Sequence, residues 1–173
     1  MQQSKLSGVT RVVLDAMGGD HAPAEPVRGA VDAVSTRDDI HVILVGQEDV
    51  VREELAKHTY PAERITVVHA EEVIETAEPP VNAIRKKKRS SIVVGMNMVK
   101  QKEADAFVSA GSSGAILVGG QAIVGRIKGV ERPPLAPVIP NMKGVSLLLD
   151  CGANVDARPS QLLQFAKMGS VYM

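Results

Sequence analysis

The sequence predicts an α/β fold in which helices cover both faces of a mostly parallel β-sheet. Short apolar segments alternate with helical segments along the chain, which is the pattern of consecutive βαβ units. The longest of these strand segments is apolar on both faces, as buried parallel strands are. Only four of the 173 residues are aromatic, two Tyr and two Phe, so Val, Ala, Leu and Ile must form the core.

The first part of the chain begins with three strand segments separated by helices. Residues 12–14 form a short apolar strand that ends at Asp15, before the turn-forming pair Gly18-Gly19. A helix then follows Pro26, because its apolar residues recur at intervals of three and four: Val27, Ala30, Val31 and Val34. The next predicted elements are a strand over residues 40–45, a charged helix around Val51 and Leu55, and a strand over residues 65–68.

The alternation continues to the end of the chain. Pro79-Pro80 begins a helix through Ile84, and Ser90-Ser91 is predicted to cap another, with Ile92, Met96 and Val99 on one face. The remaining elements are a strand over 106–108, an apolar helix over 115–127, a strand over 145–149 and an amphipathic helix over 159–168. Residues 129–144 contain four prolines and are predicted to form a long loop, which is more often functional than idle.

Composition excludes several classes of protein. Twenty basic residues balance twenty acidic ones, so the chain has no overall attraction to nucleic acid, and its few aromatic residues offer no stacking platform for single strands. No apolar run reaches the roughly 20 residues that span a bilayer, and the N-terminus lacks the apolar core of a signal peptide. We therefore expect a soluble, cytoplasmic protein with a polar tail over residues 1–8 and one α/β domain over residues 9–173.

The strongest candidate site follows the predicted strand at 106–108. Ligands of parallel α/β sheets bind beyond the carboxyl ends of the strands, and here the segment reads Ser109-Ala110-Gly111-Ser112-Ser113-Gly114. Glycines let the backbone approach an anion, and a helix N-terminus with serine hydroxyls offers donors. The segment matches neither the Walker nor the dinucleotide-binding pattern. It predicts either an anion site or an ordinary capped turn.

Two further strand ends resemble each other. Asp15 precedes Gly18-Gly19-Asp20-His21, and Asp150 precedes Gly152-Ala153-Asn154. An Asp at such a position either organises the loop or takes part in chemistry. Taken alone, each is expected to organise its loop, but two such groups on one sheet edge favour function. We interpret His21 as a surface residue and Cys151 as a small buried hydrophobe, and no cluster has metal-ligand spacing.

A run of five basic residues interrupts an otherwise neutral chain: Arg85, Lys86, Lys87, Lys88 and Arg89. Such a run is either a solvated, self-repelling segment or a docking patch for an acidic partner or a phosphorylated ligand. Binding at a docking patch would weaken as the salt concentration rises. The sequence leaves both interpretations open.

Taken together, the motifs resemble the bacterial phosphate acyltransferase family PlsX, as its N-terminal half. The resemblance covers nearly the whole chain in one order and is carried by residues 15–20, 80–88, 104–111, 126–133, 148–156 and 164–172. The chain departs from the family at Ser112-Ser113, where Asn-Thr is usual. Family members also continue for roughly as many residues again, so the chain resembles the first part of a two-lobed enzyme.

The resemblance implies a reaction and a set of partners. In this family an acyl group moves from acyl carrier protein (ACP) to inorganic phosphate, which gives acyl phosphate for phospholipid synthesis without a cofactor. It also implies a three-layer α/β/α fold similar to isocitrate and isopropylmalate dehydrogenases and to phosphotransacetylase. A homodimer is implied, as is a cytoplasmic protein able to associate with the inner face of the membrane.

The implied chemistry suggests roles for particular residues. The phosphate cradle is expected at Ser109, Gly111, Ser112, Ser113 and Gly114, with Arg132 neutralising the anion. Asp20 is expected to position a donor and Asn154 to hydrogen-bond the thioester carbonyl, while the basic run would dock ACP. Two alternatives are a non-catalytic anion- or partner-binding fragment and an NAD-dependent dehydrogenase, although the latter lacks its fingerprint here.

Overall fold

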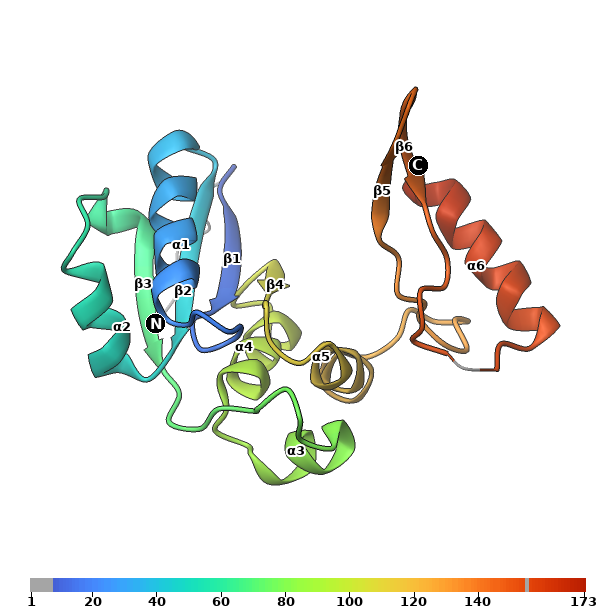
Figure 1. Ribbon diagram of the computed structural model, residues 1–173, viewed down its shortest axis with the longest axis horizontal. Helices are drawn as coiled ribbons and strands as arrows, with labels where there is room; N and C mark the ends of the chain where they lie inside the picture. The colour runs from blue at the N-terminus through green and yellow to red at the C-terminus, as the bar shows by residue number, and fades with distance from the viewer. Residues whose placement is uncertain (1–7, 155) are drawn as a thin grey trace. The chain divides into compact units, whose positions relative to one another are not determined.

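A computed structural model describes residues 8–154 and 156–173 of the chain (Figure 1). Apart from Gly8, the predicted polar tail lies outside the described residues. Contacts divide the chain into two compact units, of which the first extends to Val124 and the second runs from Gly125 to Met173. Each unit has a sheet of its own.

The first unit contains a four-stranded parallel sheet in the order β3-β2-β1-β4. Its strands are β1 (Thr10–Asp15), β2 (Ile40–Gly46), β3 (Ile65–His69) and β4 (Ala106–Val108). Val12 of β1 lies between Val42 of β2 and Ala106 of β4. All four strands occur where the sequence predicts them. Because they are parallel, the loops that follow β1 and β4 emerge side by side at one edge of the sheet.

Helices cover both faces of this sheet, which confirms the predicted three-layer architecture. Val42 and Leu44 of β2 pack in one cluster with α1 (Ala24–Thr36) and α2 (Glu48–Leu55). Ile43 and Val45, the alternate residues, lie in a second cluster with side chains of α4 (Ser91–Lys100). Successive strand residues point to opposite faces, so a strand that is apolar throughout binds helices on both sides.

A third cluster joins α4 to two short helices. It contains Ile84 of α3 (Pro80–Lys86), Met96 of α4 and Ala115 of α5 (Ser113–Gly119). Ser90 caps α4 as predicted, since its Oγ accepts the Val93 N–H at 3.4 Å. Helix α5 continues as the π-helical segment η2 (Gly120–Val124) and stops short of the predicted end at 127, because Gly125 has a φ of +98°. A short 3-10 turn, η1 (Ala62–Arg64), precedes β3.

The second unit differs from the sequence-based prediction. The strand predicted at 145–149 is β6 (Gly144–Leu147), which pairs antiparallel with β5 (Val138–Asn141) and does not join the parallel sheet. Strand β5 lies inside the segment predicted to be a loop. Asn141 Oδ1 accepts the Lys143 N–H at 2.8 Å and so stabilises the tight turn between the strands. Helix α6 (Pro159–Tyr172) follows the hairpin and is longer than predicted.

Candidate functional site

The loops after β1 and β4 are joined by a buried carboxyl group. Asp15, 1% exposed at the end of β1, accepts the Met17 N–H on Oδ1 at 3.0 Å and the Ser109 hydroxyl on Oδ2 at 2.7 Å. Ser109 Oγ in turn accepts the Gly111 N–H at 3.0 Å. Through this chain of hydrogen bonds, Asp15 fixes the position of the loop that follows β4.

Glycines allow the two loops to approach each other. A Cβ atom at Gly18 would lie 2.6 Å from Asp15 Oδ2 and 2.8 Å from the backbone nitrogen of Gly111, closer than real contacts. Gly19 has a φ of +102°, and a Cβ there would lie 3.2 Å from that of Ala110. The Gly-Gly pair noted in the sequence is therefore required by close backbone approach as well as by the turn.

A pocket of about 490 Å³ opens beside this contact, at the carboxyl end of the sheet. Its wall combines the loop after β1 with Val108, Ser109 and Ala110. Of the predicted site residues, Asp20 and Ser109 line it, and His21, interpreted from the sequence as a surface residue, is exposed on its wall. The structure thus brings together the residues after two neighbouring strands, as expected for a parallel sheet.

The remaining cradle residues have different surroundings. Ser112, 3% exposed, accepts the Ala115 N–H on Oγ at 3.3 Å and is the N-cap of α5. Gly114 lies against α3, because a Cβ there would be 2.6 Å from Pro80 Cγ. Ser113 is exposed at the first turn. The capped-turn interpretation is therefore right for Ser112, and the anion-site interpretation depends on Ser113 and the backbone.

Arg132 and Asn154 lie together in the second unit, where Arg132 Nη1 donates to Asn154 Oδ1 at 3.4 Å. Asn154 Nδ2 donates to Asp150 Oδ2 at 3.0 Å and to the Pro133 carbonyl at 3.4 Å. The side-chain amide thus holds the loop in the described conformation. The catalytic role assigned to Asn154 stays a prediction.

Asp150 organises this loop. Its carboxylate accepts the N–H groups of Leu135 at 2.7 Å, Asn154 at 2.7 Å and Ala153 at 3.4 Å. Partial burial alone would raise the pKa of Asp150, but these hydrogen bonds outweigh it and hold the pKa below its ordinary value. The expectation that Asp15 and Asp150 share one sheet edge is wrong, because β6 pairs with β5 instead of joining the parallel sheet. Cys151 beside it is exposed, not buried as expected.

This lowered pKa predicts loss of loop order in acid. A group whose pKa is depressed by folding stabilises the folded state above its unfolded pKa, 3.8 for Asp150, and loses that effect as the pH falls through the folded value. We expect the protection of the Leu135 and Asn154 amides from hydrogen exchange to decrease when the pH is lowered below about 4. In Asp150→Asn the protection should be lower at neutral pH and nearly independent of pH. The same acid transition in Asp150→Asn would contradict this assignment.

Two residues of the basic run, Lys87 and Arg89, form contacts with the segment before α3. Lys87 Nζ donates to the Val73 carbonyl at 2.6 Å and to Glu78 Oε1 at 2.5 Å, and its hydrogen bond lowers the pKa of Glu78. Arg89 forms an ion pair with Glu71. These two residues therefore stabilise the segment before α3.

The other three basic residues lie at the surface. Arg85 and Lys86 are exposed in the last turn of α3. Lys88 is exposed as well, and its Nζ donates to the Ile84 carbonyl at 3.3 Å. A docking patch formed by the run would consist of these three side chains and of Arg89, which is exposed as well but forms an ion pair with Glu71.

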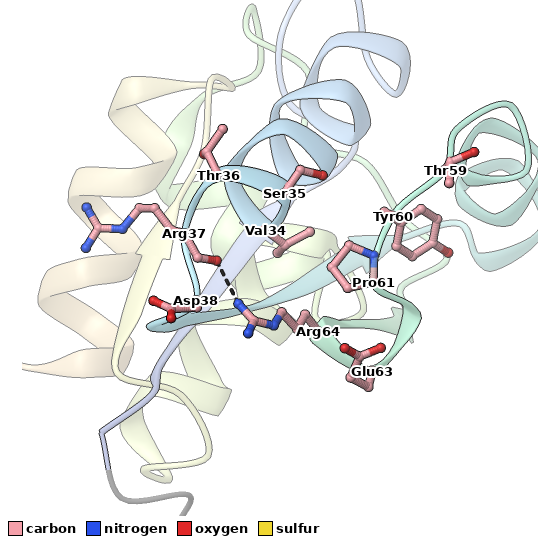
Figure 2. Close-up of a pocket in the computed structure, with 10 residues that line it drawn as sticks. All are labelled: Val34, Ser35, Thr36, Arg37, Asp38, Thr59, Tyr60, Pro61, Glu63 and Arg64. Atoms are coloured by element: carbon pink, nitrogen blue, oxygen red, sulfur yellow. Dashed lines mark hydrogen bonds between the residues drawn. The ribbon is translucent and has the colours of Figure 1, made fainter.

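A second hollow, of about 740 Å³, lies at the opposite, amino-terminal end of the sheet (Figure 2). It is lined by residues 34–36 in the last turn of α1, residues 37–38 directly after it, and residues 59–61 and 63–64 before β3. Arg64 Nη1 donates to the Arg37 carbonyl at 2.8 Å, while the Arg37 guanidinium points away from the hollow. None of the predicted site residues lines it. Within the described part of the chain, no group of His, Cys, Asp and Glu could hold a metal ion, and no helix is long and apolar enough to cross a bilayer.

Two solved structures share the fold. A phosphotransacetylase from Streptococcus pyogenes superposes with a TM-score of 0.67 at 19% identity, over 93% of this chain and 52% of the other. The EutD phosphotransacetylase from Staphylococcus aureus superposes with a TM-score of 0.64 at 21% sequence identity. The match covers 94% of this chain and 52% of the other. These similarities confirm the predicted fold class.

Sequence comparison gives closer relatives. A phosphate acyltransferase of Alkaliphilus oremlandii is 54% identical over 162 residues, which are 94% of this chain and 48% of that protein. A phosphate acyltransferase of Syntrophomonas wolfei is 51% identical, over 94% of this chain and 51% of that protein. The chain thus spans about half the length of the curated relatives it matches. Residues 10–173 also match the family described as "Fatty acid synthesis protein", and the chain belongs to this family.

Proposed function

We propose that the chain carries the phosphate-binding part of an acyltransferase that moves a fatty acyl group from acyl-ACP to inorganic phosphate. The product is an acyl phosphate for phospholipid synthesis. The joined loops after β1 and β4 carry this proposal, because Asp15, Ser109 and Gly111 hold a glycine- and serine-rich turn beside a pocket. The family and the names of the relatives support the acyltransferase class.

The reaction requires the protein to position an anion. A phosphate oxygen forms a bond to the thioester carbonyl carbon, the carbon–sulfur bond breaks, and the carrier thiol leaves with the proton that phosphate loses. Because phosphate is itself the nucleophile, catalysis can rest on orientation and on stabilising the developing oxyanion. No nucleophilic side chain is needed for this step.

Particular groups are suited to these tasks. The Ser113 hydroxyl and the N–H groups of Ser113 and Gly114 at the start of α5 are proposed to donate to phosphate, since the Ser112 hydroxyl is occupied as the cap. Asp20 is proposed to position a donor from the pocket wall. Arg132 is proposed to neutralise the anion. Asn154 is proposed to donate to the thioester carbonyl, for which it must exchange one of its present hydrogen bonds.

The first test measures phosphate binding by the Ser113→Ala variant. Loss of a hydrogen bond to a charged group removes about 1.5–3 kcal/mol, so phosphate affinity should fall roughly 10- to 100-fold with an unchanged melting temperature. Ser112→Ala is the contrast, because loss of the cap should lower stability by about 1 kcal/mol. The readout is the phosphate titration of amide NMR shifts over residues 109–114. An unchanged titration in Ser113→Ala would reject the cradle.

Turnover separates the proposal from its alternative. Phosphate-dependent loss of the acyl-ACP thioester is the expected reaction. Saturable amide shifts without any turnover, in a full-length protein that contains this chain, would favour the non-catalytic anion-binding module instead.

The surface part of the basic run gives a prediction about the acyl carrier. Lys86→Glu with Lys88→Glu should raise the Kd for acyl-ACP several-fold at low ionic strength, and the difference should shrink in high salt. Lys100→Glu with Lys167→Glu is the matched control, since both residues are exposed on other helices and the charge change is equal. Calorimetric titration at two salt concentrations measures both. Equal effects of the two double variants would assign the run to a solvated surface.

A further inference from the structure

Helix α3 packs along α5 through two glycines of α5. A Cβ at Gly114 would lie 2.6 Å from Pro80 Cγ, and a Cβ at Gly119 would lie 3.3 Å from Ile84 Cδ1. Pro80 and Ile84 are one helical turn apart on α3, while Gly114 and Gly119 lie in the first and last turns of α5. The two helices are thus in contact over the whole length of α5, and Ile84 shares a buried cluster with Ala115.

This contact matters because α5 is too short to hold its own position. It has seven residues, and isolated helices shorter than about 12 residues are marginally stable in water. Its place is therefore determined by the helices that it packs against. The first turn of α5 carries the N–H groups of Ser113 and Gly114, which are proposed to donate to phosphate. The position of α3 thus determines where these donors lie.

The side chain of Lys87 ties both ends of α3 together. Lys87 follows the last residue of α3, and its Nζ reaches back to the Val73 carbonyl at 2.6 Å and to Glu78 Oε1 at 2.5 Å. Glu78 comes two residues before Pro80, at the other end of the helix. Its Oε1 also accepts the Glu75 N–H at 2.7 Å. One ion pair thus joins the end of α3 to the segment that leads into it.

The ion pair between Lys87 and Glu78 is partly shielded from solvent. The two side chains are 30% and 28% exposed. Removal of either partner leaves the other charge partly buried without its counter-ion, so the segment around Glu78 is expected to rearrange. Because Pro80 follows Glu78 so closely, this rearrangement reaches the contact between Pro80 and Gly114.

From these contacts we infer that Lys87 is a positioning residue of the anion site. Through Glu78 and Pro80 it holds the first turn of α5 in the geometry that binds phosphate. The inference rests on the proposed function for its ligand and on the contacts of α3 for its mechanism. It also gives Lys87 a role different from that of the exposed residues of the basic run, because its ammonium group acts from within the fold.

Two variants that change the charge in opposite directions test this inference. Lys87→Met removes a positive charge and Glu78→Gln removes a negative one, so a purely electrostatic effect on phosphate binding would have opposite signs. Loss of positioning should instead raise the Kd for phosphate in both variants, by roughly 2- to 30-fold. The readout is the phosphate titration of amide NMR shifts over residues 109–114 of the 173-residue chain, at a temperature where the variants are folded. If Lys87→Met does not fold, Glu78→Gln decides.

Two further variants separate positioning from stability. Lys87→Arg can still donate to Glu78 and should retain most of the affinity for phosphate. Lys57→Met is the matched control, because it breaks a Lys–Glu ion pair of 2.7 Å with Glu54 beside α2. The buried residues of α2 belong to a different cluster from those of α3 and α5, so Lys57→Met should leave the Kd unchanged. A merely structural role of Lys87 would lower the melting temperature and leave the Kd of the folded chain unchanged.

The outcomes distinguish this inference from the proposed function. A parent chain that does not respond to phosphate would reject the proposed anion site, and with it the role of Lys87. A parent chain that binds phosphate would leave the site intact, and three results would then overturn the inference. These are an unchanged Kd in Lys87→Met and Glu78→Gln, tighter binding in Glu78→Gln, and equal losses in Lys57→Met and Lys87→Met. Lys87→Arg with an affinity as low as that of Lys87→Met would also count against it.

Discussion

Replacing Asp15 by Ala is expected to destabilise the first unit by about 1–3 kcal/mol and to release the loop after β4. The substitution removes the acceptor of the Ser109 hydroxyl and of the Met17 N–H at a position that is 1% exposed. Ser109 then loses its orientation toward the Gly111 N–H. The measurements are urea unfolding and the amide NMR shift of Gly111, with and without phosphate.

Two further variants sharpen this prediction. Asp15→Asn keeps an acceptor of the same shape, so its free energy of unfolding should lie between that of Asp15→Ala and that of the parent chain. Asp32→Ala removes an exposed carboxylate of α1 and should change stability by less than about 0.5 kcal/mol. If Asp15→Ala unfolds like Asp32→Ala and leaves the Gly111 shift unchanged, Asp15 does not position the loop.

The parallel sheet could be predicted because its strands are apolar on both faces. Residues 42–45 of β2 contact one helix layer through Val42 and Leu44 and the other through Ile43 and Val45. That pattern is present in the sequence alone. The hairpin could not be predicted in the same way, because Pro137 and Pro140 resemble loop residues. Its exposed strands are determined by pairing and by the turn at Asn141, which composition does not reveal.

The candidate site was predictable only in part. The loop after β4 stood out through its glycines and serines, but its contact with Asp15 depends on the strand order, in which β4 lies beside β1. The alternation of strands and helices in a sequence predicts that the strands are parallel. It does not predict which strands lie next to each other in the sheet. The two serines after Gly111 look equivalent in sequence, yet Ser112 is buried as a cap and Ser113 is exposed. Likewise, the hydrogen bond between Lys87 and Glu78 is evident only in the folded chain.

Gly18→Ala is expected to destabilise the first unit although it adds only one methyl group. The new Cβ would lie 2.6 Å from Asp15 Oδ2 and 2.8 Å from Gly111 N, so it meets a buried carboxyl group and a backbone atom, neither of which is the end of a flexible side chain. Overpacking of this kind costs about 1–3 kcal/mol. Because the two loops must separate, the phosphate titration of residues 109–114 should weaken as well.

Gly29→Ala is the matched control for this methyl group. Gly29 lies within α1, and a Cβ there would have no neighbour within 4 Å, so the substitution should stabilise the chain by about 0.5–1 kcal/mol through helix propensity. Thermal unfolding of both variants measures the change in stability, which should be a loss for Gly18→Ala and a gain for Gly29→Ala. If Gly18→Ala is as stable as the parent and retains its phosphate response, the loops do not need their close approach. A stable Gly18→Ala that has lost the response would instead show that the approach serves binding more than folding.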